Sequence, residues 1–480
     1  MKISAPLRAE TVLVNPPIAR EQQYGVKFRT GMQTPNLGLA LLAAILRGKG
    51  RSVAVMDCAC EGVPFDVAVA RVVSLAPKYV GLTAVTMTVT AAAAFARAVK
   101  EALPGVRVIV GGPHITALPE ETARRLGIFF DAAVIGEGDE TLPELLSAFE
   151  GRRTLSSVRG IALPDENGRI SFTPPRPPVE DMDTLPFPAW DLLPVIGPQY
   201  NYPGTVKRFP SALILTSRGC PNVCKFCANP FGRKSRTHSA GYIVAMMEHL
   251  RSAYGIREIM LRDDNSSCLP GRIEELCRVI MERGLDMSWN CLLRVDAVNP
   301  ERLALMKKAG CWQIWLGLES GSDRVLNISA KGISTAKSRE AVHMVKAAGL
   351  SPAGLFMVGL PGETVADIEL TIKMALELPL EGFVMSHFRP LPGSEFYSTA
   401  EHYGRFNDDW EKSSGWRPIF VPDGLSEEEL VSSLNSAYRR FFLRPRIIAH
   451  LLSTMTSWNH IMMYMGALQG FLAITSSRRR

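Results

Sequence analysis

Cysteine is absent from the last third of this 480-residue chain, because the ninth and last cysteine is Cys311. This absence argues against a metal centre of cysteine ligands in the C-terminal part. The chain also starts without an apolar signal core, and its cysteines are too sparse for the disulfide framework of a secreted protein. We therefore expect a cytoplasmic protein with reduced thiols.

The chain also has only a small excess of positive over negative charge. The net charge is only +7, and no basic stripe with interleaved aromatics is present, which argues against a nucleic-acid partner.

Residues 447–477 contain no Asp, Glu, Lys or Arg, but polar residues such as His450 and Asn459 interrupt them. A membrane-spanning helix needs about 20 mostly apolar residues. We expect this tail to pack over the preceding domain; the alternative is an interfacial helix with residues 478–480 on lipid headgroups.

Three cysteines form the strongest motif of the chain. Cys220, Cys224 and Cys227 have Cys-x3-Cys-x2-Cys spacing and follow the apolar residues 212–215, which predict a buried strand. Thiolates bind iron–sulfur clusters, and three of them leave one iron of a 4Fe–4S cluster open to a substrate or cofactor. The alternative is zinc, which usually takes four ligands in Cys-x2-Cys pairs, and no second pair follows.

Strand and helix patterns alternate over the first 150 residues. Strands are predicted near residues 11–17, 52–56, 79–83, 106–110 and 132–135, with helices over 37–46 and 91–103. This alternation predicts an α/β fold with a doubly wound parallel sheet, which binds ligands beyond the carboxyl ends of its strands. The candidate binding residues at those ends are Asp57, Thr83, Thr86, Gly111, Gly112, Pro113, His114, Gly136 and Glu137.

A proline-dense stretch separates this domain from a second alternating region. Residues 151–210 are expected to form a linker, because paired prolines resist regular structure. Six further strand patterns begin near residues 212, 258, 288, 314, 354 and 382, and each ends in polar or glycine residues. Function is therefore expected at the carboxyl ends of these strands.

The cysteine motif resembles the signature of the radical S-adenosylmethionine superfamily, in which an aromatic residue, here Phe226, precedes the last cysteine. The N-terminal region is similar to the cobalamin-binding domain found ahead of the radical domain in one large subfamily. This resemblance implies a Rossmann-like cobalamin domain over residues 1–150, the linker, a partial (β/α)6 barrel over 211–395 and a mainly helical region over 396–480. The implied cofactors are one 4Fe–4S cluster, S-adenosylmethionine and cobalamin.

The resemblance also implies contacts with S-adenosylmethionine. A carboxylate, Asp263 or its neighbour Asp264, would accept from the methionyl ammonium, and Arg294 would bind the carboxylate. Glu319 would meet the ammonium or the ribose hydroxyls. Two glycines would admit the adenine. The full predicted set is Phe226, Asp263, Arg294, Glu319, Gly354 and Gly359.

The predicted cobalamin domain departs from one known pattern. Other cobalamin proteins have an Asp-x-His-x-x-Gly loop whose histidine ligates cobalt from below, whereas this chain has Ala59 at that position, between Asp57 and Gly62. Because members of the radical subfamily commonly lack this histidine, the resemblance implies cobalt without a protein imidazole underneath. His114 is expected to line the pocket. The alternative is a nucleotide-binding or purely structural sheet.

The predicted function is methyl transfer to an unactivated carbon. In that reading a 5′-deoxyadenosyl radical removes hydrogen from the substrate, which then takes a methyl group from methylcobalamin. One alternative is a non-methylating enzyme such as a tetrapyrrole-type oxidative cyclase, and another is a cobalamin-binding sensor with an inactive barrel. Expected partners are a small-molecule or lipid-like substrate and an electron donor such as flavodoxin or ferredoxin; the interfacial alternative for the tail would add a membrane surface.

Overall fold

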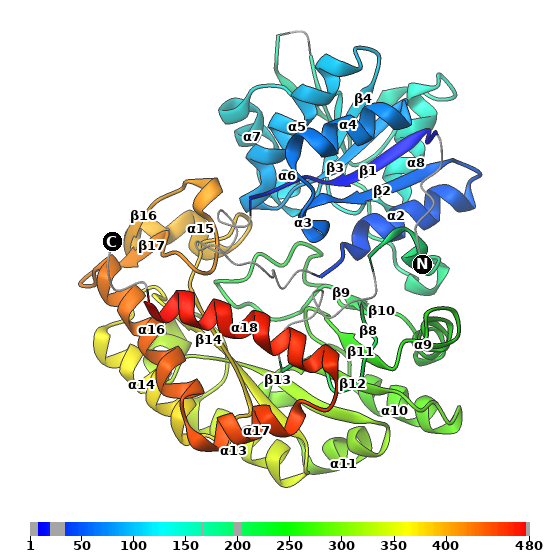
Figure 1. The fold of residues 1–480 in the computed structure, drawn as a ribbon. Coiled ribbons are helices and arrows are strands. Elements are labelled where there is room, and N and C mark those ends of the chain that lie inside the picture. The colour runs from blue at the N-terminus through cyan, green and yellow to red at the C-terminus, as the bar shows by residue number, and fades with distance from the viewer. Residues whose placement is uncertain (1–7, 20–33, 166, 195–203, 477–480) are drawn as a thin grey trace. The chain divides into compact units, whose positions relative to one another are not determined.

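The computed structural model describes residues 8–19, 34–165, 167–194 and 204–476. The chain divides into two compact units (Figure 1). Of the described residues, the first unit contains 8–19, 34–165, 167–194 and Asp409–Ser413, and the second contains 204–408 and 414–476.

A seven-stranded sheet forms the middle of the first unit, in the order β2-β1-β3-β4-β5-β6-β7. The first five strands are parallel, which confirms the predicted doubly wound sheet. The strands are β1 (Thr11–Asn15), β2 (Val53–Asp57), β3 (Tyr79–Thr83), β4 (Arg107–Gly111), β5 (Ala132–Val134), β6 (Ile161–Pro164) and β7 (Ile170–Phe172).

Helices cover both faces of this sheet because its strands are apolar on both sides. Val12 and Val80 pack with α4 (Phe65–Leu75) and α5 (Val89–Ala102) in one core. Their neighbours in the chain, Leu13 and Tyr79, pack with α2 (Leu37–Gly48) and α8 (Gly138–Phe149) in the other. The shorter helices are α3 (Cys58–Glu61), α6 (Pro113–Ala117), α7 (Pro119–Leu126) and the 3-10 helices η1 (Thr86–Thr88) and η2 (Leu155–Ser157).

The last two strands of the sheet lie within the predicted linker. β6 pairs antiparallel with β5, and β7 pairs antiparallel with β6. Asp165 closes the turn between them by accepting hydrogen bonds from the Asn167 and Arg169 backbone N–H groups. The hairpin is short, and Phe172 is 48% exposed, so it carries little of the apolar pattern that predicts strands. The 3-10 helices η3 (Met182–Thr184) and η4 (Trp190–Leu192) follow, and residues 195–203 of the linker lie outside the described residues.

The second unit contains a six-stranded parallel sheet in the order β15-β14-β13-β12-β11-β8. Each strand pairs with the next strand of the barrel in sequence, which confirms the partial (β/α)6 barrel and brings all carboxyl ends to one edge. The strands are β8 (Ser211–Ile214), β11 (Glu258–Leu261), β12 (Ser288–Leu293), β13 (Cys311–Glu319), β14 (Ser351–Val358) and β15 (Gly382–His387). The helices between them are α9 (Ala240–Tyr254), α10 (Arg272–Glu282), α11 (Pro300–Lys308), α12 (Asp323–Ile328), α13 (Thr335–Ala347) and α14 (Val365–Glu377), with the 3-10 helix η6 (Val295–Ala297).

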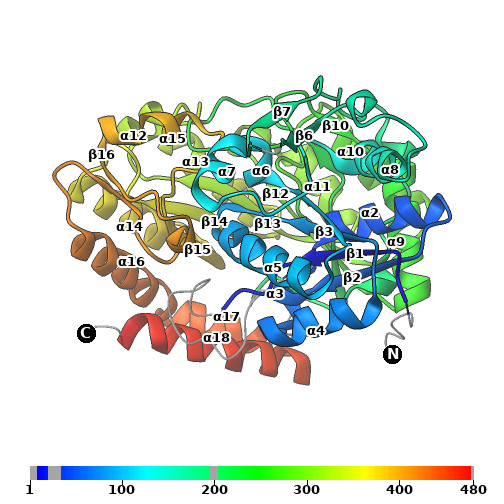
Figure 2. The same cartoon turned by 90° about the horizontal axis from the view of Figure 1, so that it is seen from above.

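The C-terminal region is mainly helical, as predicted. Ser426 and Glu429 form a capping box that starts α16 (Glu427–Phe442), and α17 (Pro445–Thr454) and α18 (Trp458–Ser476) pack on α16 (Figure 2). Before them come α15 (Glu395–Thr399), η7 (Ala400–His402), β16 (Gly404–Phe406), η8 (Trp410–Lys412) and β17 (Phe420–Pro422). Within the described residues, no helix combines the length and the apolarity needed to cross a membrane.

One segment of this region returns to the first unit. The 3-10 helix η8 contacts η1 and α5. Trp410 is 4% exposed, and its ring centroid lies 4.4 Å from that of His114. Arg125 Cζ lies 4.3 Å from the centroid of the Trp410 ring. No pattern in the sequence predicted this insertion.

Candidate active site

The cysteine loop begins after β8 and is closed by a short hairpin. β9 (Ser217–Arg218) pairs antiparallel with β10 (Arg236–Thr237). Gly219 has φ +82°, and a Cβ there would lie 2.4 Å from the Lys234 carbonyl oxygen, so only glycine fits. The Cys220 N–H donates to the Gly232 carbonyl at 3.1 Å. The local sequence thus folds the loop back on itself just before the first cysteine.

The three predicted cluster ligands lie on this loop. Cys224 is buried, Cys220 is half-buried and Cys227 is exposed. Desolvation raises the pKa of the Cys227 thiol although the residue keeps exposed surface, and a hydrogen bond from the Asn229 backbone opposes this rise. Among the described residues the thiols do not by themselves converge into a metal-holding group. Three thiols on one tightly turned loop are nevertheless the donor set that suits a 4Fe–4S cluster.

Asp263 anchors the base of the cysteine loop. Its Oδ1 accepts from the Thr216 N–H at 2.6 Å and the Ser217 N–H at 2.9 Å, and its Oδ2 accepts from the Thr216 hydroxyl at 2.7 Å. Arg272 Nη2 lies 3.3 Å from the same Oδ2, and the Asp263 side chain has no exposed surface. The structure therefore gives Asp263 a loop-holding role, whereas the alternative carboxylate, Asp264, is exposed.

Glu319 and Phe226 are brought together by a lysine that the sequence analysis did not name. Glu319 ends β13 with φ +61°, after a register shift against β14 that re-aims its side chain. Its Oε1 accepts from Lys331 Nζ at 2.7 Å. The same Nζ lies 5.5 Å from the centroid of the Phe226 ring. No signal in the sequence marked Lys331, because it lies in the short loop between α12 and α13.

Arg294 lies beside the cysteine loop, at the carboxyl end of β12. Its Nη1 lies 3.8 Å from Cys224 Sγ, so the guanidinium contacts the second cysteine of the motif directly. Its Nη2 donates to Asp296 at 3.0 Å and to the Lys331 carbonyl at 3.0 Å. The predicted Arg294 is thus oriented by neighbours on two different loops.

The two predicted glycines have different surroundings. A Cβ on Gly354 would lie 2.7 Å from Phe356 and 3.1 Å from both Leu318 and Leu380, so apolar side chains fill this space. Gly359 has φ +83° and donates its N–H to the buried Glu363 at 2.6 Å. Burial raises the pKa of Glu363 to about 8. Gly359 therefore shapes the turn after β14.

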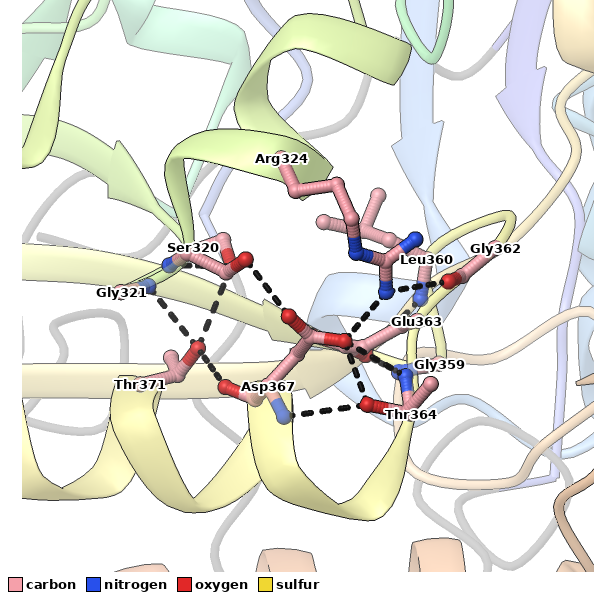
Figure 3. A network of polar contacts seen from close by, with 11 residues as sticks. Ser320, Gly321, Arg324, Gly359, Leu360, Gly362, Glu363, Thr364, Asp367 and Thr371 are labelled. Atoms are coloured by element: carbon pink, nitrogen blue, oxygen red, sulfur yellow. Dashed lines mark hydrogen bonds and ion pairs between the residues drawn. The ribbon is translucent and has the colours of Figure 1, made fainter.

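A polar network supports the loop that follows Glu319 (Figure 3). Asp367 of α14 accepts from the Ser322 hydroxyl at 2.6 Å, from the Thr364 N–H at 3.0 Å and from Arg324. Thr371, one turn further along α14, accepts from the Gly321 N–H at 2.9 Å. Burial alone would raise the pKa of Asp367, but these hydrogen bonds lower it to about 2. No sequence pattern indicates this network, because α14 is far from β13 in the chain.

In the first unit the predicted cobalamin residues gather at the carboxyl ends of β2 to β5. Thr83 ends β3 and Gly111 ends β4. Gly112 has φ +104°, and a Cβ there would lie 2.6 Å from the Ala84 carbonyl oxygen. Gly136 is exposed, and a Cβ there would meet nothing within 4 Å, so the backbone is open to a ligand. The next residue, Glu137, accepts from the Val179 N–H at 3.0 Å, and Pro113 is exposed.

The hydrogen bonds of Asp57 give it a structural role. It is 1% exposed and accepts from Asn15 Nδ2 at 2.7 Å, the Asn36 N–H at 2.7 Å and the Cys60 N–H at 3.3 Å. Burial raises its pKa, against the effect of these hydrogen bonds. It caps α3, which places Ala59 in a buried helical turn.

His114 is enclosed rather than free to move. It is 1% exposed, and its Nδ1 lies 3.1 Å from Thr86 Oγ1. Within the described residues its Nε2 is buried with no hydrogen-bond partner. Burial and then the charge of Arg125 lower the pKa of His114 to about 4, so the ring is neutral near pH 7. His114 is therefore closed in by Thr86 and Trp410, and the exposed backbone at Gly136 is the part of this edge that a ligand can reach.

Sequence comparisons match both halves of the chain to known families. The profile of the Radical SAM superfamily matches residues 214–375, and that of the B12 binding domain matches residues 25–146. The uncharacterized methyltransferase PH0819 of Pyrococcus horikoshii is 33% identical over 91% of this chain and 93% of its own length. The chain belongs to the cobalamin-binding radical S-adenosylmethionine enzymes. Its cofactors are a 4Fe–4S cluster, S-adenosylmethionine and cobalamin.

Two further proteins are similar to the enzyme over most of its length. The anaerobic magnesium-protoporphyrin IX monomethyl ester cyclase of Rubrivivax gelatinosus is 28% identical over 87% of this chain and 75% of its own length. The structure of the radical S-adenosylmethionine methyltransferase TsrM from Kitasatospora setae, with cobalamin and a 4Fe–4S cluster bound, superposes with a TM-score of 0.67. That match covers 92% of this enzyme and 90% of TsrM at 17% identity, and it confirms the fold.

Proposed function

We propose that this enzyme transfers a methyl group from S-adenosylmethionine to an unactivated carbon of its substrate. The observation that carries the proposal is the match over nearly the full length of both chains to a protein named as a methyltransferase. When bound, the cluster supplies the electron that cleaves S-adenosylmethionine, and cobalamin supplies the methyl group.

The residues of the chain bind and orient in this proposal. Cys220, Cys224 and Cys227 would hold the cluster. Arg294, fixed by Asp296 and the Lys331 carbonyl, would receive the carboxylate of S-adenosylmethionine. Glu319 would meet its ribose or ammonium group. Asp264, rather than the enclosed Asp263, is the carboxylate that remains available to a ligand.

The test uses S-adenosylmethionine with a trideuterated methyl group. Anaerobically reconstituted enzyme with cobalamin, reductant and candidate acceptors should give 5′-deoxyadenosine and a product heavier by the labelled methyl group. Mass spectrometry reads both products. Formation of 5′-deoxyadenosine with a product that carries no label would contradict methyl transfer, and no cleavage at all would favour the sensor alternative.

A second candidate is an oxidative cyclase. It is favoured by the 28% identity to an enzyme named as a cyclase on a tetrapyrrole. The same labelled assay separates the two functions, because a cyclisation changes the substrate without adding a methyl group.

Reductive cleavage also needs an electron from outside the chain. We therefore propose an external donor such as flavodoxin or ferredoxin. Reduction of the cluster by reduced flavodoxin, followed in the absorbance spectrum, tests this partner.

We also propose that the tail rests on a membrane surface and that the substrate is small and lipid-like. Several exposed apolar residues repeat at helical spacing along α18, namely Trp458, Met462, Met465, Leu468 and Leu472. Upstream arginines do not reinforce this face, because Arg444 and Arg446 donate to the Leu376 and Leu378 carbonyls and Arg440 pairs with Glu369. The predicted headgroup contacts of residues 478–480 lie outside the described residues.

A further inference from the structure

A buried lysine connects the cysteine loop to the end of β13. Lys331 is 8% exposed and follows α12, where its N–H donates to the Leu326 carbonyl at 3.0 Å. Its Nζ pairs with Glu319 Oε1 at 2.7 Å. The same Nζ lies 5.5 Å from the centroid of the Phe226 ring, within the range of a cation–π contact.

The space for this ion pair is provided by a glycine. A Cβ on Gly317 would lie 2.6 Å from Glu319 Oε1 and 3.0 Å from Lys331 Nζ. Any larger residue at position 317 would therefore displace both charged groups. The Glu319 side chain is 12% exposed, so the carboxylate is mostly desolvated and a charge left alone there would be costly.

The backbone around Lys331 also holds the cysteine loop. The Lys225 N–H donates to the Ser329 carbonyl at 3.0 Å, and Arg294 donates to the Lys331 carbonyl at 3.0 Å while contacting Cys224 Sγ. One short segment, residues 329–331, therefore touches the cysteine loop, Arg294 and Glu319. These are the parts that would hold the cluster and S-adenosylmethionine.

We propose that Lys331 is a positioning residue for S-adenosylmethionine. It fixes the Glu319 carboxylate through Oε1, which leaves Oε2 for the ligand, and it sets the distance from that carboxylate to the cysteine loop through Phe226. It also neutralises Glu319, so that the carboxylate offers a fixed acceptor rather than an unpaired charge. The proposal rests on cleavage of S-adenosylmethionine and not on the later transfer of methyl.

The test compares Lys331→Met with Lys331→Arg in the anaerobically reconstituted enzyme, without any methyl acceptor. Lys331→Met keeps the length of the side chain but removes the charge, whereas Lys331→Arg keeps the charge. The matched control is Lys346→Met, since Lys346 also pairs with a glutamate, Glu381, but lies 47% exposed on α13. Three quantities are measured: iron content, equilibrium binding of S-adenosylmethionine, and its dithionite-driven cleavage.

Lys331→Met should retain wild-type iron content but bind S-adenosylmethionine about tenfold or more weakly, as expected for the loss of one hydrogen bond to a charged group. Its KM for cleavage should rise more than its kcat falls, and the change that S-adenosylmethionine causes in the electron paramagnetic resonance spectrum of the reduced cluster should be reduced. Lys331→Arg should restore most of the affinity, and Lys346→Met should match wild type.

Wild-type affinity and an unchanged spectrum in Lys331→Met would overturn the proposal. Equal loss of iron in Lys331→Met and Lys331→Arg would also overturn it, because the lysine would then only support the loop. If Lys331→Met does not fold, Lys331→Gln replaces it, since glutamine is uncharged and one bond too short to reproduce the Lys331–Glu319 contact. Weaker binding by folded Lys331→Gln supports the proposal, and wild-type binding contradicts it. Failure of methyl transfer with normal cleavage would count against the proposed function alone.

Discussion

Asp367 offers a direct test of how the loop after Glu319 is held. The pKa of this carboxyl lies near 2 in the folded enzyme, against an ordinary value of 3.8, because the hydrogen bonds drawn in Figure 3 outweigh its burial. Each pKa unit corresponds to about 1.4 kcal/mol. Asp367→Asn, which cannot accept all of these hydrogen bonds, should therefore destabilise the second unit by about 2 kcal/mol at pH 7.

The direction of the pKa shift determines how this cost depends on pH. A carboxyl with a lowered folded-state pKa stabilises the protein above its unfolded pKa, and this stability is lost as the pH falls from 3.8 toward about 2. Between about pH 5 and pH 8 Asp367 is ionised in both states, so the cost of Asp367→Asn should be constant there.

Thermal unfolding followed by circular dichroism measures this cost. Two kcal/mol corresponds to a fall of roughly 4–8 °C in the midpoint of the barrel transition. The control is Glu377→Gln on the same helix, where Glu377 is 44% exposed and pairs with Arg339, because such surface pairs contribute at most about 1 kcal/mol. An Asp367→Asn midpoint equal to that of the control, or a cost that changes between these pH values, would refute the reasoning.

Three other predictions concern the cofactors and the tail. Reconstituted enzyme should hold about four irons per chain, as one cluster requires, and Cys224→Ala should abolish cleavage of S-adenosylmethionine; eight irons or an active variant would contradict this. The electron paramagnetic resonance spectrum of the cob(II)alamin form should lack nitrogen splitting, because Ala59 replaces the usual ligand and His114 is enclosed; splitting that disappears in His114→Ala would contradict it. Flotation with anionic liposomes should weaken when Met462 and Met465 are both changed to Glu. The control Val67→Glu, a similar change on α4, should float like wild type. Equal flotation of the two variants would show that the tail does not bind the membrane.

The sequence predicted the main strands well because their patterns are local. The predicted and observed spans of β3, Tyr79–Thr83, are identical, and the six barrel strands lie where apolar runs end in polar or glycine residues. The cysteine motif could be predicted in the same way, since its three cysteines lie within eight residues. These features depend on neighbours in the chain, which a sequence displays directly.

The supporting residues could not be predicted in this way. Lys331 meets Glu319 across α12, and Asp367 meets Ser322 from a helix 45 residues further along. A buried lysine or aspartate looks like any surface charge until its partner is known. Asp263 shows the same limit, because only the fold reveals that Thr216 and Ser217 already occupy its carboxylate.

The Asp409–Ser413 segment has a consequence for how the enzyme is made. The first unit is nearly complete at residue 195, yet Trp410, which encloses His114, is synthesised more than two hundred residues later. At ordinary translation speeds that interval lasts roughly ten to forty seconds. During this time the nascent first unit stands without Trp410, so the edge at His114 and Thr86 lacks this cover. A chimera that exchanged only the N-terminal residues of the first unit between relatives would lack a matching Trp410, because Asp409–Ser413 follows the barrel in the chain.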